Sequence, residues 1–272
     1  MFRSSIIMMT FASASLLAAC GQEAPAPAET APPPPAPPPA PELVADPAGV
    51  APYITAAVED AGRPAEQREN DAVRSPAEVV AISGMAPGDV VVDYRPGGGY
   101  YTRIFSKVVG AEGKVYATES AERTEGRPDR TEAVDAIAAD PAYSNVEVAT
   151  PPLAALDEIG EEIDIVWLSN NYHDIVNAET PDGMVPFNEG VFRALRPGGT
   201  YFIVDHAAPV GSGYADTDTT HRIDGEILKT DISAVGFVLE EESDLLSRPE
   251  DDRTTMASFA SAQIILKFRK PE

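Results

Sequence analysis

A hydrophobic run that ends in an acid and opens into a glycine-rich turn occupies positions 90–102, which read VVVDYRPGGGYYT. The uncharged, β-branched valines at 90–92 suit a strand that is buried on both faces of a parallel sheet. The glycines at 97–99 allow backbone conformations that other residues resist, and they leave room for a ligand. Positions 100–109 have the pattern of the following helix. The segment therefore predicts an α/β fold whose backbone faces a nucleotide-like cofactor.

The rest of the domain alternates predicted strands with predicted helices. We expect further strands at 114–118, 146–148, 163–168, 200–204, 237–239 and 263–268, and helices at 129–139, 185–195 and 223–235. Short loops between alternating elements indicate a parallel sheet with right-handed crossovers. Because no helix separates the last two strands, we expect them to form an antiparallel pair. Helical spacing at 51–68 and 76–81 predicts a short helical cover before the first strand.

The N-terminal residues have the pattern of an export signal. One positive charge at Arg3 precedes an apolar run at 6–17 that is too short to span a membrane, and small residues follow. The ending at 17–21, LAACG, resembles the lipobox of bacterial lipoproteins, in which the cysteine becomes the lipidated first residue. Cys20 is the only cysteine of the chain, so no disulfide or zinc cage can form from cysteines.

Three parts of the chain follow from this pattern. We expect a lipoprotein signal peptide at 1–19, a proline- and alanine-rich tether at 20–52 and a folded domain at 53–272. The tether should be extended and semi-rigid, with no core of its own. These expectations place the protein outside the cytoplasm, lipid-anchored in the bacterial envelope and facing the periplasm from the outer membrane.

The formal net charge of −24 restricts the partners that we expect. Acids are spread through the domain as well as the tether, which argues against a nucleic-acid groove. The sequence has no cluster of lysine and arginine that could bind anionic lipid, so membrane attachment would come only through the lipid on Cys20. A small molecule is therefore the partner that we expect. The sequence does not indicate an oligomeric state.

Positions 76–271 resemble the class I S-adenosylmethionine-dependent methyltransferases. The resemblance rests on the acid and glycine turn at 93–99, an acid at Glu119 after the second strand, and LRPGGTYFIVD at 195–205. The motifs PGGGYYTR, NYHD and HRID are similar to those of a bacterial group of predicted methyltransferases. The resemblance implies a Rossmann-like fold with a seven-stranded, mostly parallel sheet that ends in an antiparallel strand pair. It also implies S-adenosylmethionine as the cofactor.

The resemblance also implies roles for individual residues. Asp93 and the glycine turn would lie against the methionine part of the cofactor, and Glu119 would accept hydrogen bonds from its ribose. Asn170 and Asn171 would face the sulfonium and the substrate. The predicted cofactor residues are thus Asp93, Gly97, Gly98, Gly99, Glu119, Asn170 and Asn171.

The chain departs from the family pattern at two places. Arg95 stands where glycine is common, and this cation would be unfavourable beside a sulfonium unless it turns outward or pairs with an acid. Thr150 and its neighbours replace an acid that is common near the adenine. A nicotinamide cofactor is a weaker alternative, because its motif needs a glycine or alanine where Thr102 stands. The turn could also be only a tight connection between a strand and a helix.

All three histidines, His173, His206 and His221, follow the fourth or fifth predicted strand, at the side where parallel sheets bind ligands. His173 can act as a base near neutral pH and remove a proton from the methyl acceptor. Asp174 would orient its ring or hold a cationic substrate. The candidate catalytic residues are His173, Asp174 and Tyr172.

A metal ion is an alternative at the same place. Asp174 and Asp205 follow the fourth and fifth strands, and carboxylates together with histidine suit manganese, iron or zinc. Sequence adjacency alone does not establish ligand geometry, so we assign no metal ligand from the sequence.

We therefore expect an S-adenosylmethionine-dependent methyltransferase that acts on an unidentified small molecule. The alternative is an envelope-tethered protein that binds a small ligand and has lost methyl transfer. The reason for this alternative is the location of the protein, because S-adenosylmethionine is made in the cytoplasm and the predicted signal peptide directs the chain elsewhere. A nicotinamide-dependent oxidoreductase is the lesser alternative.

Overall fold

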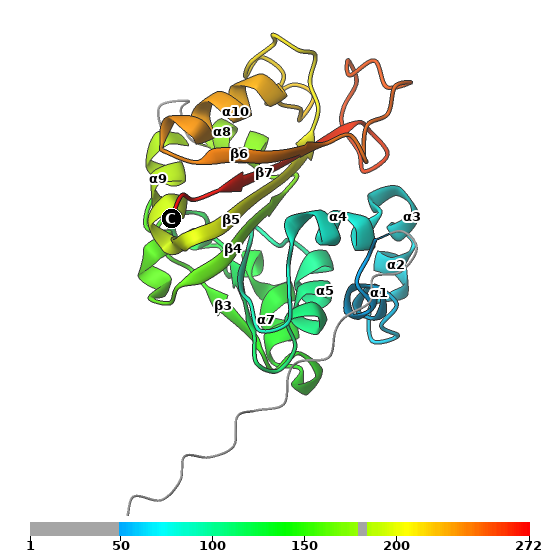
Figure 1. Ribbon diagram of the computed structural model, residues 1–272, viewed down its shortest axis with the longest axis vertical. Helices are drawn as coiled ribbons and strands as arrows, with labels where there is room; N and C mark the ends of the chain where they lie inside the picture. Colours follow the sequence, from blue (N-terminus) through cyan, green and yellow to red (C-terminus); the bar gives the residue numbers. More distant parts are fainter. Residues whose placement is uncertain (1–48, 179–183) are drawn as a thin grey trace, which may run out of the picture. The chain divides into compact units, whose positions relative to one another are not determined.

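The domain is built on a seven-stranded sheet with the strand order β3-β2-β1-β4-β5-β7-β6 (Figure 1). The computed structural model describes residues 49–178 and 184–272. The strands are β1 (Val90–Tyr94), β2 (Lys114–Thr118), β3 (Val146–Ala149), β4 (Ile163–Ser169), β5 (Leu195–His206), β6 (Val238–Ser243) and β7 (Gln263–Arg269). Neighbours among β1 to β5 are parallel, whereas β7 runs antiparallel to both β5 and β6. This confirms the predicted Rossmann-like methyltransferase fold, including its C-terminal antiparallel pair.

Helices cover both faces of the sheet. Their bounds are α1 (Pro52–Val58), α2 (Ala65–Arg68), α3 (Asp71–Arg74), α4 (Pro76–Ser83), α5 (Tyr100–Val109), α6 (Ala121–Thr124), α7 (Glu132–Ala138), α8 (Tyr172–Ala178), α9 (Met184–Ala194) and α10 (Gly225–Ala234), with 3₁₀ turns at Pro128–Arg130, Pro141–Tyr143 and Leu156–Ile159. Alternate strand residues enter two separate cores, because successive side chains point to opposite faces. Val91 packs with α1, α4, α5 and α7, whereas Val92 packs with α8, α9 and α10.

The chain changes direction across the sheet between β1 and β4. It runs from β1 outward to β3 and then returns to place β4 on the other side of β1. The loops after β1 and β4 therefore diverge at their carboxyl ends. In parallel α/β sheets this is the place where a ligand crevice forms.

The structure differs from the sequence-based predictions at four places. The helix α8 was not predicted, and the cover consists of four short helices rather than a long segment at 51–68. The strand predicted at 200–204 is longer in the structure, because β5 begins at Leu195 and its pairing with β4 passes from Leu195 to Thr200 through a bulge. β6 is longer than the strand predicted at 237–239. The prediction was too short because this edge strand is mostly exposed and rich in acids, so hydrophobic alternation does not mark its full length.

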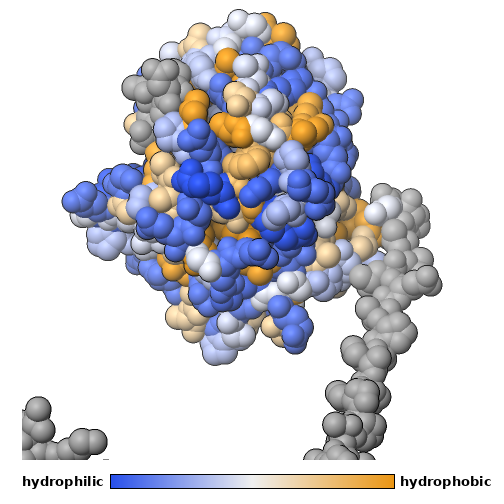
Figure 2. Space-filling view, turned by 60° about the vertical axis from the view of Figure 1, so that its left-hand side comes forward, coloured by the Kyte–Doolittle hydropathy of each residue, from blue (hydrophilic) through white to orange (hydrophobic). Residues whose placement is uncertain are grey.

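The first described residues already belong to the domain. Val50 is buried in the core cluster, and α1 begins at Pro52. The predictions for the signal peptide, Cys20 and most of the tether lie outside the described residues. Among the described residues, no helix is both long and apolar enough to cross a membrane. The face in Figure 2 carries mainly hydrophilic side chains, with apolar ones scattered between them.

Candidate functional site

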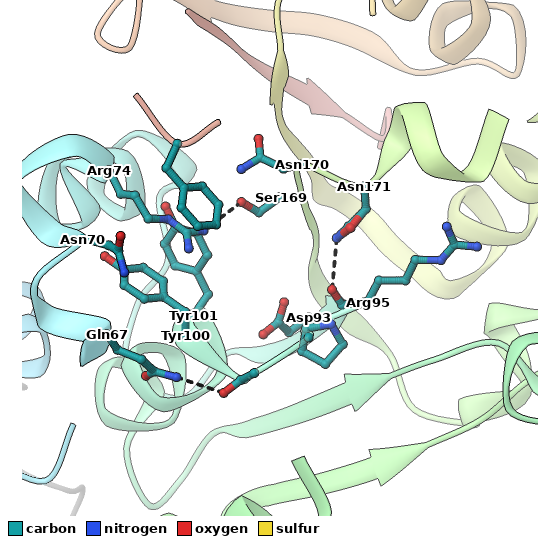
Figure 3. A pocket seen from close by; sticks show the side chains of 14 residues that line it. Gln67, Asn70, Arg74, Asp93, Arg95, Tyr100, Tyr101, Ser169, Asn170 and Asn171 are labelled. Atoms are coloured by element: carbon teal, nitrogen blue, oxygen red, sulfur yellow. Dashed lines mark hydrogen bonds between the residues drawn. The ribbon is translucent and has the colours of Figure 1, made fainter. Parts of the chain in front are cut away.

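A cavity of about 370 Å³ opens at the carboxyl ends of β1 and β4 (Figure 3). The helical cover, the β1–α5 turn, the residues after β4 and the β6–β7 loop all contribute to its wall. Its lining residues are Gln67, Asn70, Arg74, Asp93, Arg95, Pro96, Gly97, Gly98, Tyr100, Tyr101, Ser169, Asn170, Asn171 and Phe259. The predicted crevice therefore exists, and it contains most of the predicted cofactor residues.

Asp93 supplies a buried carboxyl group to this cavity. Its side chain is 3% exposed, and the Thr102 hydroxyl donates a hydrogen bond of 2.6 Å to Asp93 Oδ2. Burial raises the pKa of Asp93 to about 7, although the bond from Thr102 and the charge of Arg74 both favour the carboxylate. A bound cation would shift this poised carboxyl group toward its charged form.

The glycine turn exposes backbone to the cavity and is held from outside. Gly97 has a φ of +55°, and a Cβ atom built there would meet nothing within 4 Å. The carbonyl of Gly98 accepts hydrogen bonds of 2.9 Å from the side chains of Gln67 and Arg103. Because Gln67 comes from α2, the helical cover fixes the turn as well as closing the cavity.

Arg95 points away from Asp93, as Figure 3 shows. Its side chain is 8% exposed, and its Nε and Nη1 atoms are buried with no hydrogen-bond partner among the described residues. Burial lowers the pKa of Arg95, although the charges of Tyr94, Glu119 and Asp174 favour its charged form. The guanidinium is thus directed away from Asp93, but it stays buried rather than turning outward.

The two asparagines after β4 differ in their hydrogen bonds. Asn171 is buried, and its Nδ2 donates to the carbonyls of Tyr94 and Arg95 at 2.9 and 3.1 Å. It therefore ties β4 to the end of β1. Asn170 has a φ of +56°, and its buried Oδ1 has no hydrogen-bond partner in the described part of the chain. Asn170 lines the cavity, so this acceptor is available to a ligand.

Glu119 lies outside the cavity lining. It is buried at the end of β2, where its Oε2 accepts a hydrogen bond of 2.9 Å from Nε of Arg123. Thr150, the second departure from the family pattern, does not line the cavity either. The ribose role of Glu119 remains a prediction.

The cavity also has an aromatic wall that the sequence did not indicate. The Arg74 guanidinium lies 3.9 Å from the ring centre of Tyr100 and 4.4 Å from that of Phe259. Its Nη2 donates to the Ser169 hydroxyl at 3.3 Å. These residues come from the cover, α5, β4 and the β6–β7 loop, so no local motif marks the group. Arg74 places a buried cation at the cavity wall.

The three histidines lie near one another, and none of them is among the lining residues of this cavity. His173 Nδ1 lies 2.7 Å from Asp205 Oδ1, and the backbone N–H of His173 donates to Asp205 Oδ2 at 3.0 Å. Asp174 Oδ1 lies 3.4 Å from His173 Nε2 and 3.3 Å from His221 Nδ1. The ring centre of His206 is 6.0 Å from that of His173. The structure therefore brings together side chains that follow β4 and β5.

Burial and neighbouring charges shift the pKa values of this group in opposite directions. Burial alone would lower the pKa of His173, but Asp205 outweighs it and raises that pKa. Burial also opposes ionisation of Asp205, yet His173 holds the pKa of Asp205 below its usual value. Burial lowers the pKa of His206 to about 4 despite Asp205. His206 is consequently neutral at physiological pH.

The structure does not bring Tyr172 to this group. Its side chain is fully buried in the core beneath α8, where Asn188 Nδ2 donates to its hydroxyl at 2.9 Å. Neighbouring helix residues point in different directions, so Tyr172 and His173 face opposite surroundings. The catalytic role predicted for Tyr172 has no support from this geometry.

Comparisons with known proteins agree with the fold. No protein-family model matches the chain. The curated ubiquinone/menaquinone biosynthesis C-methyltransferase of Hydrogenovibrio crunogenus is 27% identical over 126 residues, which are 46% of this chain and 45% of that protein. The matched segment is thus less than half of the relative's length.

Two solved structures share the fold at low identity. A methyltransferase from Aquifex aeolicus, described as S-adenosylmethionine-dependent, has a TM-score of 0.54 and 16% identity, with 76% of this chain and 98% of that chain covered. An arsenic(III) S-adenosylmethionine methyltransferase from Chlamydomonas reinhardtii has a TM-score of 0.52 and 20% identity, with 81% and 74% covered. The relative and these two structures are described as methyltransferases, and the two structures share the fold of this chain.

Proposed function

From the Rossmann-like methyltransferase fold we infer that this chain binds S-adenosylmethionine and transfers its methyl group to a small acceptor. The observation that carries the inference is the cavity at the β1–β4 switch point, which Asp93 and Asn170 both line. Asp93 is buried there, and Asn170 Oδ1 has no hydrogen-bond partner among the described residues. A glycine turn without side chains borders that space. Ligands of parallel α/β folds bind at this position.

The residues present fit the cofactor. The Asp93 carboxylate would accept hydrogen bonds from its ammonium group, and Arg74 would attract its carboxylate. Asn170 would pair with a polar group of the cofactor, since its buried oxygen has no partner within residues 49–178 and 184–272. The turn at 97–98 leaves room for backbone contact. When bound, the cofactor supplies an electrophilic methyl group, and the protein's part is to hold the acceptor in line with it.

On the acceptor side we assign His173. Asp205 fixes its Nδ1, which leaves Nε2 facing Asp174 and His221. Nε2 is then free to take up either a proton or a metal ion. Tyr172 has no part in this proposal, because its hydroxyl is bonded in the core.

Calorimetric titration of the purified protein tests the cofactor proposal. We expect saturable binding of one S-adenosylmethionine, and of its demethylated product, per chain. NAD⁺ should give no heat, which separates the proposal from the oxidoreductase alternative. The Asn170→Ala variant should bind the cofactor roughly tenfold more weakly, because it loses about one hydrogen bond. An absence of heat at high micromolar cofactor would refute the proposal, whereas tight binding without turnover would favour the tethered binding protein.

We also propose that Cys20 carries a lipid that anchors the domain in the bacterial envelope. The proposal rests on the sequence LAACG at 17–21 and the apolar run before it. In a bacterial host that is fed labelled palmitate, we expect the label on the full chain and none on the Cys20→Ala variant. Equal labelling of both chains, or of neither, would contradict lipidation at Cys20.

A further inference from the structure

We propose that His173 Nε2, the Asp174 carboxylate and His221 Nδ1 bind a divalent first-row transition-metal ion. One ligand atom from each of these residues lies within 4.8 Å of the others. Asp174 Oδ1 stands between the two rings, 3.4 Å from His173 Nε2 and 3.3 Å from His221 Nδ1. Neighbouring ligand atoms around a small metal ion are separated by distances of this order, since each lies about 2 Å from the ion.

The donor set matches this class of ion. Two imidazole nitrogens and one carboxylate oxygen are typical of zinc and of non-haem iron, whereas magnesium and calcium prefer oxygen ligands. Three protein ligands leave coordination positions open, as in catalytic rather than structural metal sites. An acceptor with an oxygen or nitrogen donor could fill one of these positions.

The contact between His173 and Asp205 is an independent sign of a metal ligand. Asp205 is completely buried and lies 2.7 Å from His173 Nδ1. A carboxylate that accepts a hydrogen bond from one ring nitrogen fixes the tautomer and leaves the other nitrogen as a lone-pair donor. Asp205 also accepts bonds from the backbone N–H groups of His173 and His206, so its own orientation is fixed.

His221 is held in place by its neighbour. Its φ of +54° is unusual for a residue with a side chain, so the surrounding structure must enforce it. The Arg222 guanidinium is fully buried and donates to the carbonyls of Ala207 and Thr255 at 3.0 and 2.9 Å. Ile223 pairs with Ala207 just after β5. The loop therefore presents His221 to α8 from a fixed base.

Exposure and charge are also suitable. The side chain of His173 is 3% exposed, whereas those of Asp174 and His221 are each 45% exposed, so an ion can enter from solvent. Imidazole ligands carry no charge when they bind a metal, so the negative charges near the ion come from Asp174 and Asp205. The Arg95 cation is close enough to interact with Asp174, and it could pair with an anionic acceptor. Use of the ion in catalysis rests on the proposed methyl transfer, but its binding does not.

Zinc titration of chelator-treated full-length protein tests this site. We expect one Zn²⁺ per chain in the wild type, and affinity at least roughly 100-fold weaker in the Asp174→Ala and His221→Ala variants, because loss of an outer-sphere partner alone costs roughly 10–100-fold. Asp218→Ala is the matched control, since it removes an exposed acid from the same loop as His221. Asp218→Ala should bind zinc like the wild type.

Two results would overturn the proposal: a wild type that binds no zinc, or Asp174→Ala and His221→Ala variants that bind it as the wild type does. The second result would indicate adventitious binding elsewhere. Unfolding of each variant in chelator should match the wild type, because both side chains are partly exposed. Titration of the same variants with S-adenosylmethionine separates the two proposals. We expect His221→Ala to retain the cofactor, and zinc binding without cofactor binding would defeat only the methyltransferase proposal.

Discussion

Replacement of Arg222 by methionine is expected to lower the free energy of unfolding by about 3–5 kcal/mol. The guanidinium is fully buried and pairs with Asp251 at 2.9 Å, while its other hydrogen bonds satisfy the carbonyls of Ala207 and Thr255. Methionine would fill much of the same volume but leave Asp251 without its charge partner. Urea denaturation of the two proteins measures the difference.

Arg127→Met provides the matched control. Arg127 makes the same type of ion pair with Asp129, but both side chains are more than half exposed. Its loss should leave the free energy of unfolding nearly unchanged, because exposed ion pairs contribute little to stability. An Arg222→Met protein as stable as Arg127→Met would contradict this role of the Arg222–Asp251 pair.

The same substitution should disturb both parts of the site. Asp251 accepts hydrogen bonds from the backbone N–H groups of Arg253 and Ala262, so it organises the loop that carries Phe259 to the cavity. Arg222 also adjoins His221. We therefore regard the Arg222–Asp251 pair as a positioning element that connects the cavity wall with the histidine group.

Elements with strong local patterns were predictable from the sequence. The valines at 90–92 gave the first strand, and the bounds predicted for α5 and β2 match the structure. α8 was missed because it is a seven-residue helix directly after a strand, too short for a clear helical period. β6 was underestimated because its acids show neither burial nor alternation.

The candidate site was predictable only where it is local in sequence. Asp93 and the glycine turn lie within one short motif, and the structure places them in one cavity. Arg74 and Phe259 reach that cavity from distant segments, and no residue pattern marks such contacts. The metal ligands suggested from the sequence, Asp174 and Asp205, were likewise chosen without knowledge of contacts between distant segments. In the structure Asp205 pairs with His173, and His221 lies next to Asp174.

Affinity for S-adenosylmethionine is expected to rise roughly tenfold between about pH 6 and about pH 8 if Asp93 holds the cofactor's ammonium group. Burial raises the pKa of Asp93 to about 7, so the folded protein without ligand has a neutral carboxyl at the lower pH and a carboxylate at the higher pH. Only the carboxylate attracts a cation. Asp93→Asn should therefore bind the cofactor roughly 10–100-fold more weakly at about pH 8, since it loses a charge-assisted hydrogen bond.

The shape of the pH profile separates this role from a structural one. Asp93→Asn cannot ionise, so its affinity should be nearly constant over the range in which the wild type changes. Thr102→Val removes the donor that favours the carboxylate, and it should move the wild-type affinity profile to higher pH.

The raised pKa of Asp93 also means that its ionised form is disfavoured in the folded protein without ligand. The free energy of unfolding of the ligand-free wild type should therefore fall as the pH rises from about 4 to about 7, and urea denaturation should show no such fall in Asp93→Asn. If the wild type and Asp93→Asn had parallel affinity profiles, Asp93 would not be the group that holds the cofactor's charge.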